Sequence, residues 1–176
     1  MNAAVILVTG GARSGKSTRA LEIARSYPRR VMIAAAVPFD DEMTRRIEAH
    51  QSERGEEWVT IEEPLDLARA IKGIPSSSSA EATLVVVDCL TVWLGNLFHE
   101  EPDNVGARID SLVAAVASCP HDLVIVTNEI GWGVVPADDG TRQFRDVAGR
   151  LNQRIARIAT RVELVVSGIP VTIKGN

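Results

Sequence analysis

Residues 8–17, which read VTGGARSGKS, constrain the fold of this chain more than any other stretch. Gly10, Gly15, Lys16 and Ser17 fit the pattern G-x-x-x-x-G-K-[ST], whose backbone N–H groups surround phosphate oxygens. Glycine is required because a Cβ atom would obstruct the close approach of the backbone to the anion. The pattern needs a strand before it and a helix after it. The apolar VILVT precedes it and STRALEIARSY follows it without a breaker, so the sequence predicts nucleotide binding.

Three side chains, two in this motif and one later in the chain, have expected roles in binding the nucleotide and its metal. We expect Lys16 to reach the β- and γ-phosphates and the hydroxyl of Ser17 to ligate Mg²⁺. Asp88 ends the apolar run TLVVVD and could hold the same Mg²⁺. Its alternative role is to cap the helix expected from LTVWLGNLF. A glycine-rich turn that contains a lysine by chance is disfavoured by the strand and the helix around the motif.

Apolar runs of strand length recur along the chain, and segments with helical periodicity separate most of them. Nearly continuous Val, Ile and Leu are typical of strands buried on both faces of a parallel sheet. We therefore predict an α/β fold, a P-loop NTPase-like, mostly parallel, doubly wound sheet with helices on both faces, in one domain over residues 1–176. The runs lie at 5–9, 30–35, 58–62, 83–88, 123–129 and 162–168. The clearest helical stripe consists of Phe144, Val147, Leu151, Ile155 and Ile158.

Composition and charge argue against several classes of protein. The net charge of −4 disfavours a nucleic-acid groove or an anionic membrane surface as the main partner. No apolar stretch approaches the length of a membrane span, and the chain enters its first strand without a signal peptide. Cys89 and Cys119 lack metal-ligand spacing, so we expect reduced thiols. A cytoplasmic protein is therefore expected.

The three histidines differ in their surroundings. Met43, Ile47 and His50 are spaced i, i+4 and i+7, so periodicity alone favours a packed or capping role for His50. Arginines at 45, 46 and 54 nevertheless surround it, and a neutral imidazole is a competent nucleophile toward phosphorus. We expect His99 and His121 to be surface residues.

The segment 128–146, NEIGWGVVPADDGTRQFRD, follows an expected strand and places Trp132 between two glycines. One interpretation is a lid over a bulky or phosphorylated substrate. The other is a long surface loop with a structural tryptophan.

Together, these segments resemble the family of bifunctional adenosylcobinamide kinase/adenosylcobinamide-phosphate guanylyltransferases of cobalamin assembly. The matching stretches, which cover most of the chain in order, are TGGARSGKS, DDEMTRRIEAHQSERGEEWVTIEEP, VDCLTVWLGNL, TNEIGWGVVPADDGTRQFRDVAGRLNQ and SGIPVTIK. The resemblance implies that ATP or GTP, with Mg²⁺, phosphorylates adenosylcobinamide. GTP then guanylylates an enzyme histidine, and adenosylcobinamide phosphate takes up the GMP. The resemblance also implies a homotrimer.

Matched residue by residue, His50 falls on the guanylylated histidine of the family, because Arg46-Ile47-Glu48-Ala49-His50 fits R-I-x-x-H. This reverses the interpretation from periodicity. The resemblance implies that the triphosphate is held by Gly10, Gly11, Ala12, Arg13, Ser14, Gly15, Lys16 and Ser17. It places contacts to GTP or its metal at Ala34, Ala35, Ala36, Gln51, Ser52, Glu53, Arg54, Glu62 and Asp88.

The chain departs from the family pattern at two positions. Gly55 stands where proline is common, and Ala35 where threonine is common, so we expect an effect on affinity before activity. For the kinase step, Glu129 and Asp146 are candidate bases on position alone.

Two other functions remain compatible with these observations. A single-activity P-loop kinase acting on a small molecule would leave His50 unmodified. A nucleotide-dependent regulatory switch would act through a binding partner, although TNEIG lacks the lysine of the guanine-reading N-K-x-D pattern. A recombinase-type assembly module is disfavoured by the acidic charge.

Overall fold

The computed structural model describes residues 3–38, 45, 55, 57–75 and 82–175. Within them a seven-stranded sheet has the strand order β3-β2-β4-β5-β1-β6-β7. Neighbouring strands from β3 to β6 are parallel, and β7 runs antiparallel to β6. The strands are β1 (Val5–Gly10), β2 (Arg29–Ala34), β3 (Trp58–Glu62), β4 (Thr83–Asp88), β5 (Asp122–Val126), β6 (Arg161–Val166) and β7 (Ile169–Lys174).

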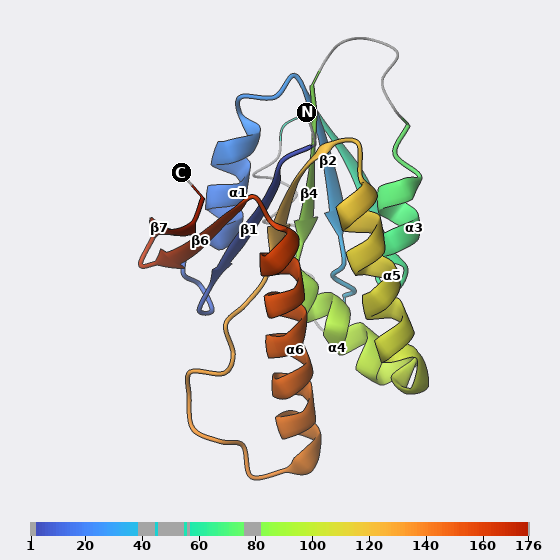
Figure 1. Ribbon diagram of the computed structural model, residues 1–176, viewed down its shortest axis with the longest axis vertical. Helices are drawn as coiled ribbons and strands as arrows, with labels where there is room; N and C mark the ends of the chain where they lie inside the picture. The colour runs from blue at the N-terminus through green and yellow to red at the C-terminus, as the bar shows by residue number, and fades with distance from the viewer. Residues whose placement is uncertain (1–2, 39–44, 46–54, 56, 76–81, 176) are drawn as a thin grey trace.

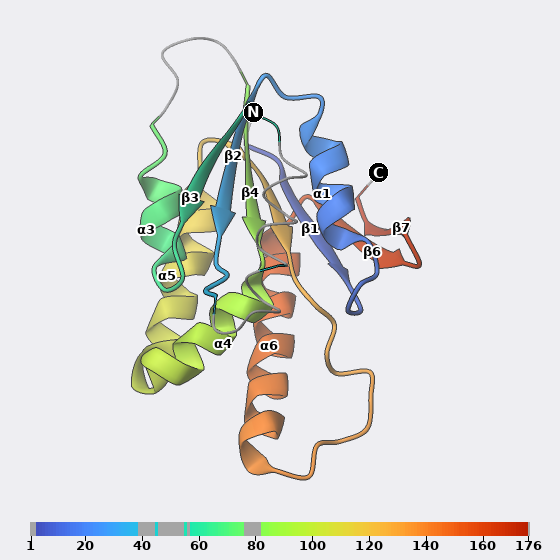
Figure 2. The ribbon, with the colours of Figure 1, turned by 180° about the vertical axis from the view of Figure 1, so that it is seen from behind.

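Helices cover both faces of this sheet (Figures 1 and 2). They are α1 (Lys16–Ala24), α3 (Leu67–Lys72), α4 (Leu90–Glu100), α5 (Val105–Ser118) and α6 (Asp139–Ile158), with a short 3₁₀ helix, η1 (Pro102–Asn104). Helix α1 packs on one face, and α3, α4, α5 and α6 pack on the opposite face. The predicted fold class, a mostly parallel sheet with helices on both faces, is confirmed.

The two hydrophobic cores explain why the strand sequences are apolar without interruption. Successive side chains of a strand point to opposite faces. Leu7 of β1 therefore joins the large core beneath α3 to α6, whereas the next residue, Val8, joins the smaller core beneath α1. In α6 the predicted stripe faces the large core, where Leu151 and Ile155 are fully buried. The remaining residues of the stripe, Phe144, Val147 and Ile158, pack against it partly buried.

Three details differ from the sequence-based expectations. The run 123–129 leaves the strand after Val126, because its polar residues turn toward other elements: the N–H of Asn128 bonds to the hydroxyl of Thr91. Strand β7 was not predicted; it is exposed along its whole length and lacks the continuously buried apolar run that marked the others. The surface prediction for His121 was wrong. Only 8% of this residue is exposed, because it lies at the packed junction of α5 and β5, whereas His99 is exposed as expected.

Among the described residues, no helix is both long enough and apolar enough to cross a membrane. Cys89 and Cys119 are free thiols, as expected.

Candidate nucleotide site

The phosphate loop (residues 10–17) joins the end of β1 to the start of α1 through backbone conformations that most side chains disfavour. Arg13 has a φ of 56° and Gly15 a φ of 100°, both in the left-handed region. Residues in such conformations form concave arrangements of N–H groups that bind anions. Gly15 is also the N-cap residue of α1 and makes no side-chain cap bond, so the N–H groups of the first turn face outward from the helix end.

Lys16 lies in the interior of this loop. The residue is 7% exposed, and its Nζ donates a hydrogen bond of 2.5 Å to the carbonyl oxygen of Gly11. Burial lowers the pKa of Lys16, while the neighbouring Cys89 and Asp88 oppose this shift. Burial also raises the pKa of Cys89 to about 11, with a further contribution from Asp88, so this thiol is neutral. The structure thus places Asp88 close enough to Lys16 to interact with it electrostatically.

The alternative role of Asp88 as a helix cap is wrong. Cys89, one residue later, occupies the N-cap position of α4, and Asp88 remains the last residue of β4. Its carboxylate stays available at the carboxyl end of the sheet, where ligands of such folds bind.

Two hydroxyls of the loop are suited to phosphate and Mg²⁺. Ser14 is not exposed, and its Oγ is buried without a hydrogen-bond partner among the described residues. Buried hydroxyls in native proteins are normally paired, so a phosphate oxygen fits this one. Ser17 lies half-buried in the first turn of α1. A serine hydroxyl and the carboxylate of Asp88 are hard oxygen ligands, and these residues therefore fit Mg²⁺.

Strand β6 supports the loop from a distant part of the sequence. Gly10 is the register partner of Val165, and a Cβ atom on Gly10 would lie 2.4 Å from the carbonyl oxygen of Val165. The N–H of Gly168, in the turn after β6, donates a hydrogen bond of 2.8 Å to the carbonyl oxygen of Ser14. Both ends of the loop are therefore held by the β6–β7 segment.

The other strand-end candidates form a row beside the loop. Glu62, Ala34 and Asp88 are register partners across β3, β2 and β4. The N–H of Ala35 donates to the carbonyl oxygen of Asp88 at 3.2 Å, and Ala36 follows in the same connection. Adjacent strands are about 4.8 Å apart, so the row spans about 10 Å.

Asn96 holds this row together and was missed in the sequence analysis. It is buried in α4, and its Nδ2 donates to the carbonyl oxygens of Ala35 at 2.8 Å and Pro64 at 3.1 Å. These carbonyls follow β2 and β3 respectively. A lone amide within an otherwise apolar helix, LTVWLGNLF, is the signal that could have indicated it.

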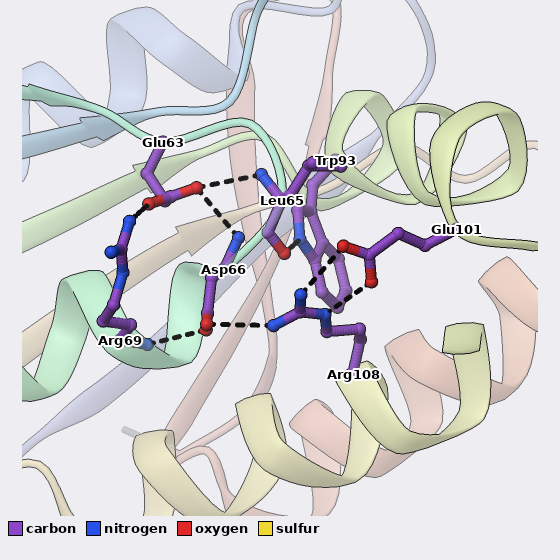
Figure 3. Close-up of polar contacts among 7 residues, drawn as sticks. All are labelled: Glu63, Leu65, Asp66, Arg69, Trp93, Glu101 and Arg108. Carbon is purple, nitrogen blue, oxygen red and sulfur yellow. Dashed lines mark hydrogen bonds and ion pairs between the residues drawn. The ribbon is translucent and has the colours of Figure 1, made fainter.

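The connection after β3 is fixed by a polar network (Figure 3). Oε1 of Glu63 accepts from the N–H groups of Leu65 and Asp66, and Oε2 accepts from Arg69. Burial would raise the pKa of Glu63, but these N–H groups and the Arg69 guanidinium outweigh burial and lower it.

The same network reaches two helices of the large core. Arg108 of α5 pairs with Asp66 at 2.9 Å and with Glu101 at 2.8 Å. The indole N–H of Trp93 in α4 donates to the carbonyl oxygen of Leu65 at 2.9 Å. The backbone that follows Glu62 is therefore held in place from both α4 and α5 (Figure 3).

The two candidate bases lie in different surroundings. The N–H of Glu129 donates to the carbonyl oxygen of Gly10 at 3.0 Å, which places Glu129 beside the phosphate loop. Asp146 lies more than half exposed on α6, where it pairs with Arg145 at 3.4 Å. Five further candidates, His50, Gln51, Ser52, Glu53 and Arg54, lie outside the described residues.

The segment between β5 and α6 leaves the sheet at the same end and extends away from the body of the molecule before α6 begins (Figure 1). It exposes large apolar side chains, including Trp132, Val134 and Val135. Trp132 is 72% exposed and is therefore not a structural tryptophan packed in a core. Helix α6 then begins where Oδ1 of Asp138 accepts from the N–H of Thr141 at 2.7 Å.

Comparisons with known proteins place the chain in a family. The sequence profile of the family CobU, described as cobinamide kinase / cobinamide phosphate guanyltransferase, matches residues 6–173. The bifunctional adenosylcobalamin biosynthesis protein CobU of Escherichia coli K12 is 41% identical over 184 residues, which cover 97% of this chain and 99% of that protein. The bifunctional adenosylcobalamin biosynthesis protein CobP of Pseudomonas aeruginosa is 41% identical over 173 residues, or 97% of each chain.

Among solved structures, a prototypical ATPase from the type III secretion system of pathogenic bacteria is similar with a TM-score of 0.55. The similarity covers 96% of this chain and 56% of that chain at 13% identity, so it concerns the P-loop NTPase fold alone. The profile match and the identity over nearly the whole chain concern the family itself. This chain belongs to the family of bifunctional cobinamide kinases and cobinamide phosphate guanylyltransferases.

Proposed function

We propose that this chain phosphorylates the aminopropanol hydroxyl of adenosylcobinamide, using ATP or GTP. It then transfers GMP from GTP, through a covalent intermediate on His50, to adenosylcobinamide phosphate. The product is adenosylcobinamide-GDP in cobalamin biosynthesis. One observation carries the nucleotide chemistry: buried Lys16 beside Asp88, within a loop in which the buried hydroxyl of Ser14 has no described partner. The names of the relatives support the corrinoid substrate.

The residues of the loop account for the binding of the triphosphate in both reactions. The backbone N–H groups of residues 10–17 and the Lys16 ammonium would contact the phosphate oxygens and neutralise charge on the departing group. Ser17 and Asp88 would hold Mg²⁺, which supplies further positive charge at the phosphates when it is bound. The lowered pKa of Lys16 reflects burial, and an anionic ligand beside it would favour the charged ammonium.

The transfer of GMP takes place in two displacements. A ring nitrogen of His50 attacks the α-phosphorus of GTP, and pyrophosphate leaves. A phosphate oxygen of adenosylcobinamide phosphate then attacks the same phosphorus and frees the imidazole. Two easier displacements, the second on a reactive phosphoramidate, replace one direct attack on GTP by a weak phosphate nucleophile.

The test is to incubate the protein with GTP and Mg²⁺, without corrinoid, and to record its intact mass beside a His50→Ala variant. We expect an acid-labile GMP adduct on the wild type alone. An adduct on both proteins would move the nucleophile to another residue. No adduct despite measured GTP binding would favour a single-activity kinase or a regulatory switch.

We also propose that one cytoplasmic domain, residues 1–176, carries both activities and assembles as a homotrimer. Strand β7 supports the assembly, because it is an edge strand whose Ile169, Val171 and Ile173 are exposed. Exposed apolar edge strands favour association with another chain. Light scattering coupled to size exclusion tests it: a mass of three chains is expected, and a monomer at all concentrations would contradict it.

A further inference from the structure

A cluster of polar side chains lies at the carboxyl end of β5, beside the phosphate loop. Besides the backbone bond to Gly10, Glu129 holds its carboxylate in a defined orientation. Its Oε1 accepts from the hydroxyl of Thr9 at 2.9 Å and from Nδ2 of Asn152 at 3.2 Å. Thr9 directly precedes the loop, so this carboxylate is anchored to the strand that leads into the phosphate site.

Asn152 fixes this arrangement from the helix that covers the strands. It is buried in α6, and its Nδ2 also donates to the carbonyl oxygen of Asn128 at 3.1 Å. Its Oδ1 accepts from the hydroxyl of Thr127 at 2.8 Å. Each hydrogen-bonding group of the amide side chain is therefore engaged by the segment that carries Glu129, which restricts the motion of that segment.

Three other carboxylates in the described part of the chain are placed differently. Asp88 lies beside Lys16, Asp146 is exposed on α6, and Glu163 is fully buried between Arg19 and Arg161. Glu129 is half-buried and has no arginine or lysine partner within the described part of the chain. A proton acceptor needs this combination, namely a positioned carboxylate next to the transferred group that is not neutralised by a cation.

We propose that Glu129 is the catalytic base of the kinase step and that Thr9 and Asn152 are its positioning residues. The inference rests on the proposed kinase function. Glu129 takes the proton of the acceptor hydroxyl while that oxygen bonds to the γ-phosphorus. The bond from the γ-phosphorus to the β,γ-bridging oxygen breaks, and the nucleoside diphosphate leaves with the electron pair. The proton passes from Glu129 to solvent after the product leaves.

The position of the exposed loop agrees with this role. Residues 131–135 are separated from Glu129 by one residue and expose Trp132, Val134 and Val135. They belong to the segment between β5 and α6 that leaves the sheet at this end (Figure 1). An acceptor hydroxyl on a large, partly apolar molecule could reach the carboxylate while the rest of the molecule contacts this loop.

The test compares Glu129→Gln with Glu129→Asp in two separate assays. The first measures phosphorylation of adenosylcobinamide, and the second measures the GMP adduct formed from GTP without corrinoid. Glutamine preserves the size of the side chain and keeps an oxygen that can accept the hydrogen bonds from Thr9 and Asn152, but it removes the base. We therefore expect kcat of the kinase step to fall at least 100-fold. Aspartate preserves the charge, so it should retain more kinase activity than glutamine. The adduct should form at the wild-type rate in both variants.

Two further variants complete the design. Thr9→Val should lower kcat of the kinase step about tenfold without changing KM, because it frees the carboxylate from one of its anchors. Glu100→Gln, the same change at an exposed glutamate of α4, is the matched control and should leave both reactions unchanged. A purely structural role for Glu129 predicts the opposite order, with glutamine better tolerated than aspartate and both reactions lost in parallel. That order, or a wild-type kinase rate in Glu129→Gln, would overturn the proposal. A wild type without kinase activity would instead refute the proposed function.

Discussion

The N–H of Gly168 bonds to the carbonyl oxygen of Ser14 at 2.8 Å, although the two residues belong to opposite ends of the chain. The phosphate loop and the β6–β7 turn also approach closely at Gly15, where an added Cβ atom would lie 3.2 Å from the Cα atom of Gly168. The β6–β7 turn therefore acts as a support for the phosphate loop. Without this turn, the left-handed conformations at Arg13 and Gly15 would depend on local sequence alone.

We expect Gly15→Ala to lower the free energy of unfolding by about 2 kcal/mol, because a left-handed residue gains a Cβ atom in a crowded position. GTP affinity should fall at least tenfold. Gly168→Ala is the matched control, since Gly168 has a φ of 82° but open space around its Cβ position. It should cost about 1 kcal/mol and leave GTP affinity unchanged. Urea unfolding and titration with a fluorescent GTP analogue measure both quantities, and equal effects of the two variants would contradict the crowding argument.

The buried pair of Arg19 and Glu163 should contribute strongly to stability. Arg19 holds Glu163 with bonds of 2.8 and 3.1 Å, and its hydrogen bonds lower the pKa of Glu163 despite burial. We expect Arg19→Met to lower the free energy of unfolding by about 3 kcal/mol, because a buried charge loses a partner. Since the pKa of Glu163 is lowered in the folded state, this difference should be present above pH 4.5, its ordinary value, and shrink as the pH falls below it.

Arg154→Ala provides the comparison for this prediction. Arg154 pairs with Asp110 at 2.7 Å, but the Asp110 side chain is mostly exposed. Removal of this surface pair should cost at most about 1 kcal/mol. Similar losses for Arg19→Met and Arg154→Ala in urea unfolding would show that burial of Glu163 does not matter.

The phenol of Tyr27 should make stability depend on alkaline pH. It donates a hydrogen bond of 2.9 Å to Oδ2 of Asp122, and burial together with this carboxylate raises the pKa of Tyr27 to about 12. The ordinary value is 10.0, so the protonated phenol stabilises the folded state fully below pH 10 and progressively less toward pH 12.

We expect the wild type to exceed Tyr27→Phe by about 1.5 kcal/mol in unfolding free energy at neutral pH. The difference should shrink between pH 10 and pH 12, the window set by the two pKa values of Tyr27. Denaturant unfolding at several pH values measures it. A difference that stays constant across this window would mean that the phenol titrates normally.

Truncation of Trp132 should affect substrate binding, whereas truncation of Trp93 should affect stability. Trp132→Ala removes an exposed side chain and should change unfolding free energy by less than about 0.5 kcal/mol. It should raise KM for adenosylcobinamide if the loop contacts the acceptor. Trp93→Ala empties a buried position and should cost about 4 kcal/mol. Steady-state kinetics and thermal unfolding separate the two effects, and an unchanged KM in Trp132→Ala would remove the loop from the acceptor site.

Much of the architecture follows from local patterns in the chain. Residues 10–17 predict the phosphate loop because the required glycines, lysine and serine are contiguous. TLVVVD predicts β4, and the stripe that contains Leu151 and Ile155 predicts α6, because side-chain periodicity reflects burial on one or both faces. The position of Asp88 near the phosphate loop was also predictable, since the loop follows one strand of the parallel sheet and Asp88 ends another.

The side chains that hold the site in place could not be predicted from such local patterns. The bonds from Asn96 to Ala35 and from Asn152 to Glu129 join residues 61 and 23 positions apart. Both asparagines lie in stretches that match the family, but no role was expected of either, and each becomes informative once the strand order places its helix over a particular connection. The choice between Glu129 and Asp146 likewise depended on which residue lies beside Gly10.

The same dependence on distant contacts explains why neither the burial of His121 nor the presence of β7 was predicted from the sequence. Local periodicity reports how a segment is buried, but it does not report which distant segment buries it or pairs with it. The order β3-β2-β4-β5-β1-β6-β7 places β5 and β6 on either side of β1, and the β6–β7 turn against Ser14. Motif and periodicity thus specify most of the elements and the phosphate-binding chemistry, whereas long-range packing decides β7 and which side chains hold that chemistry in place.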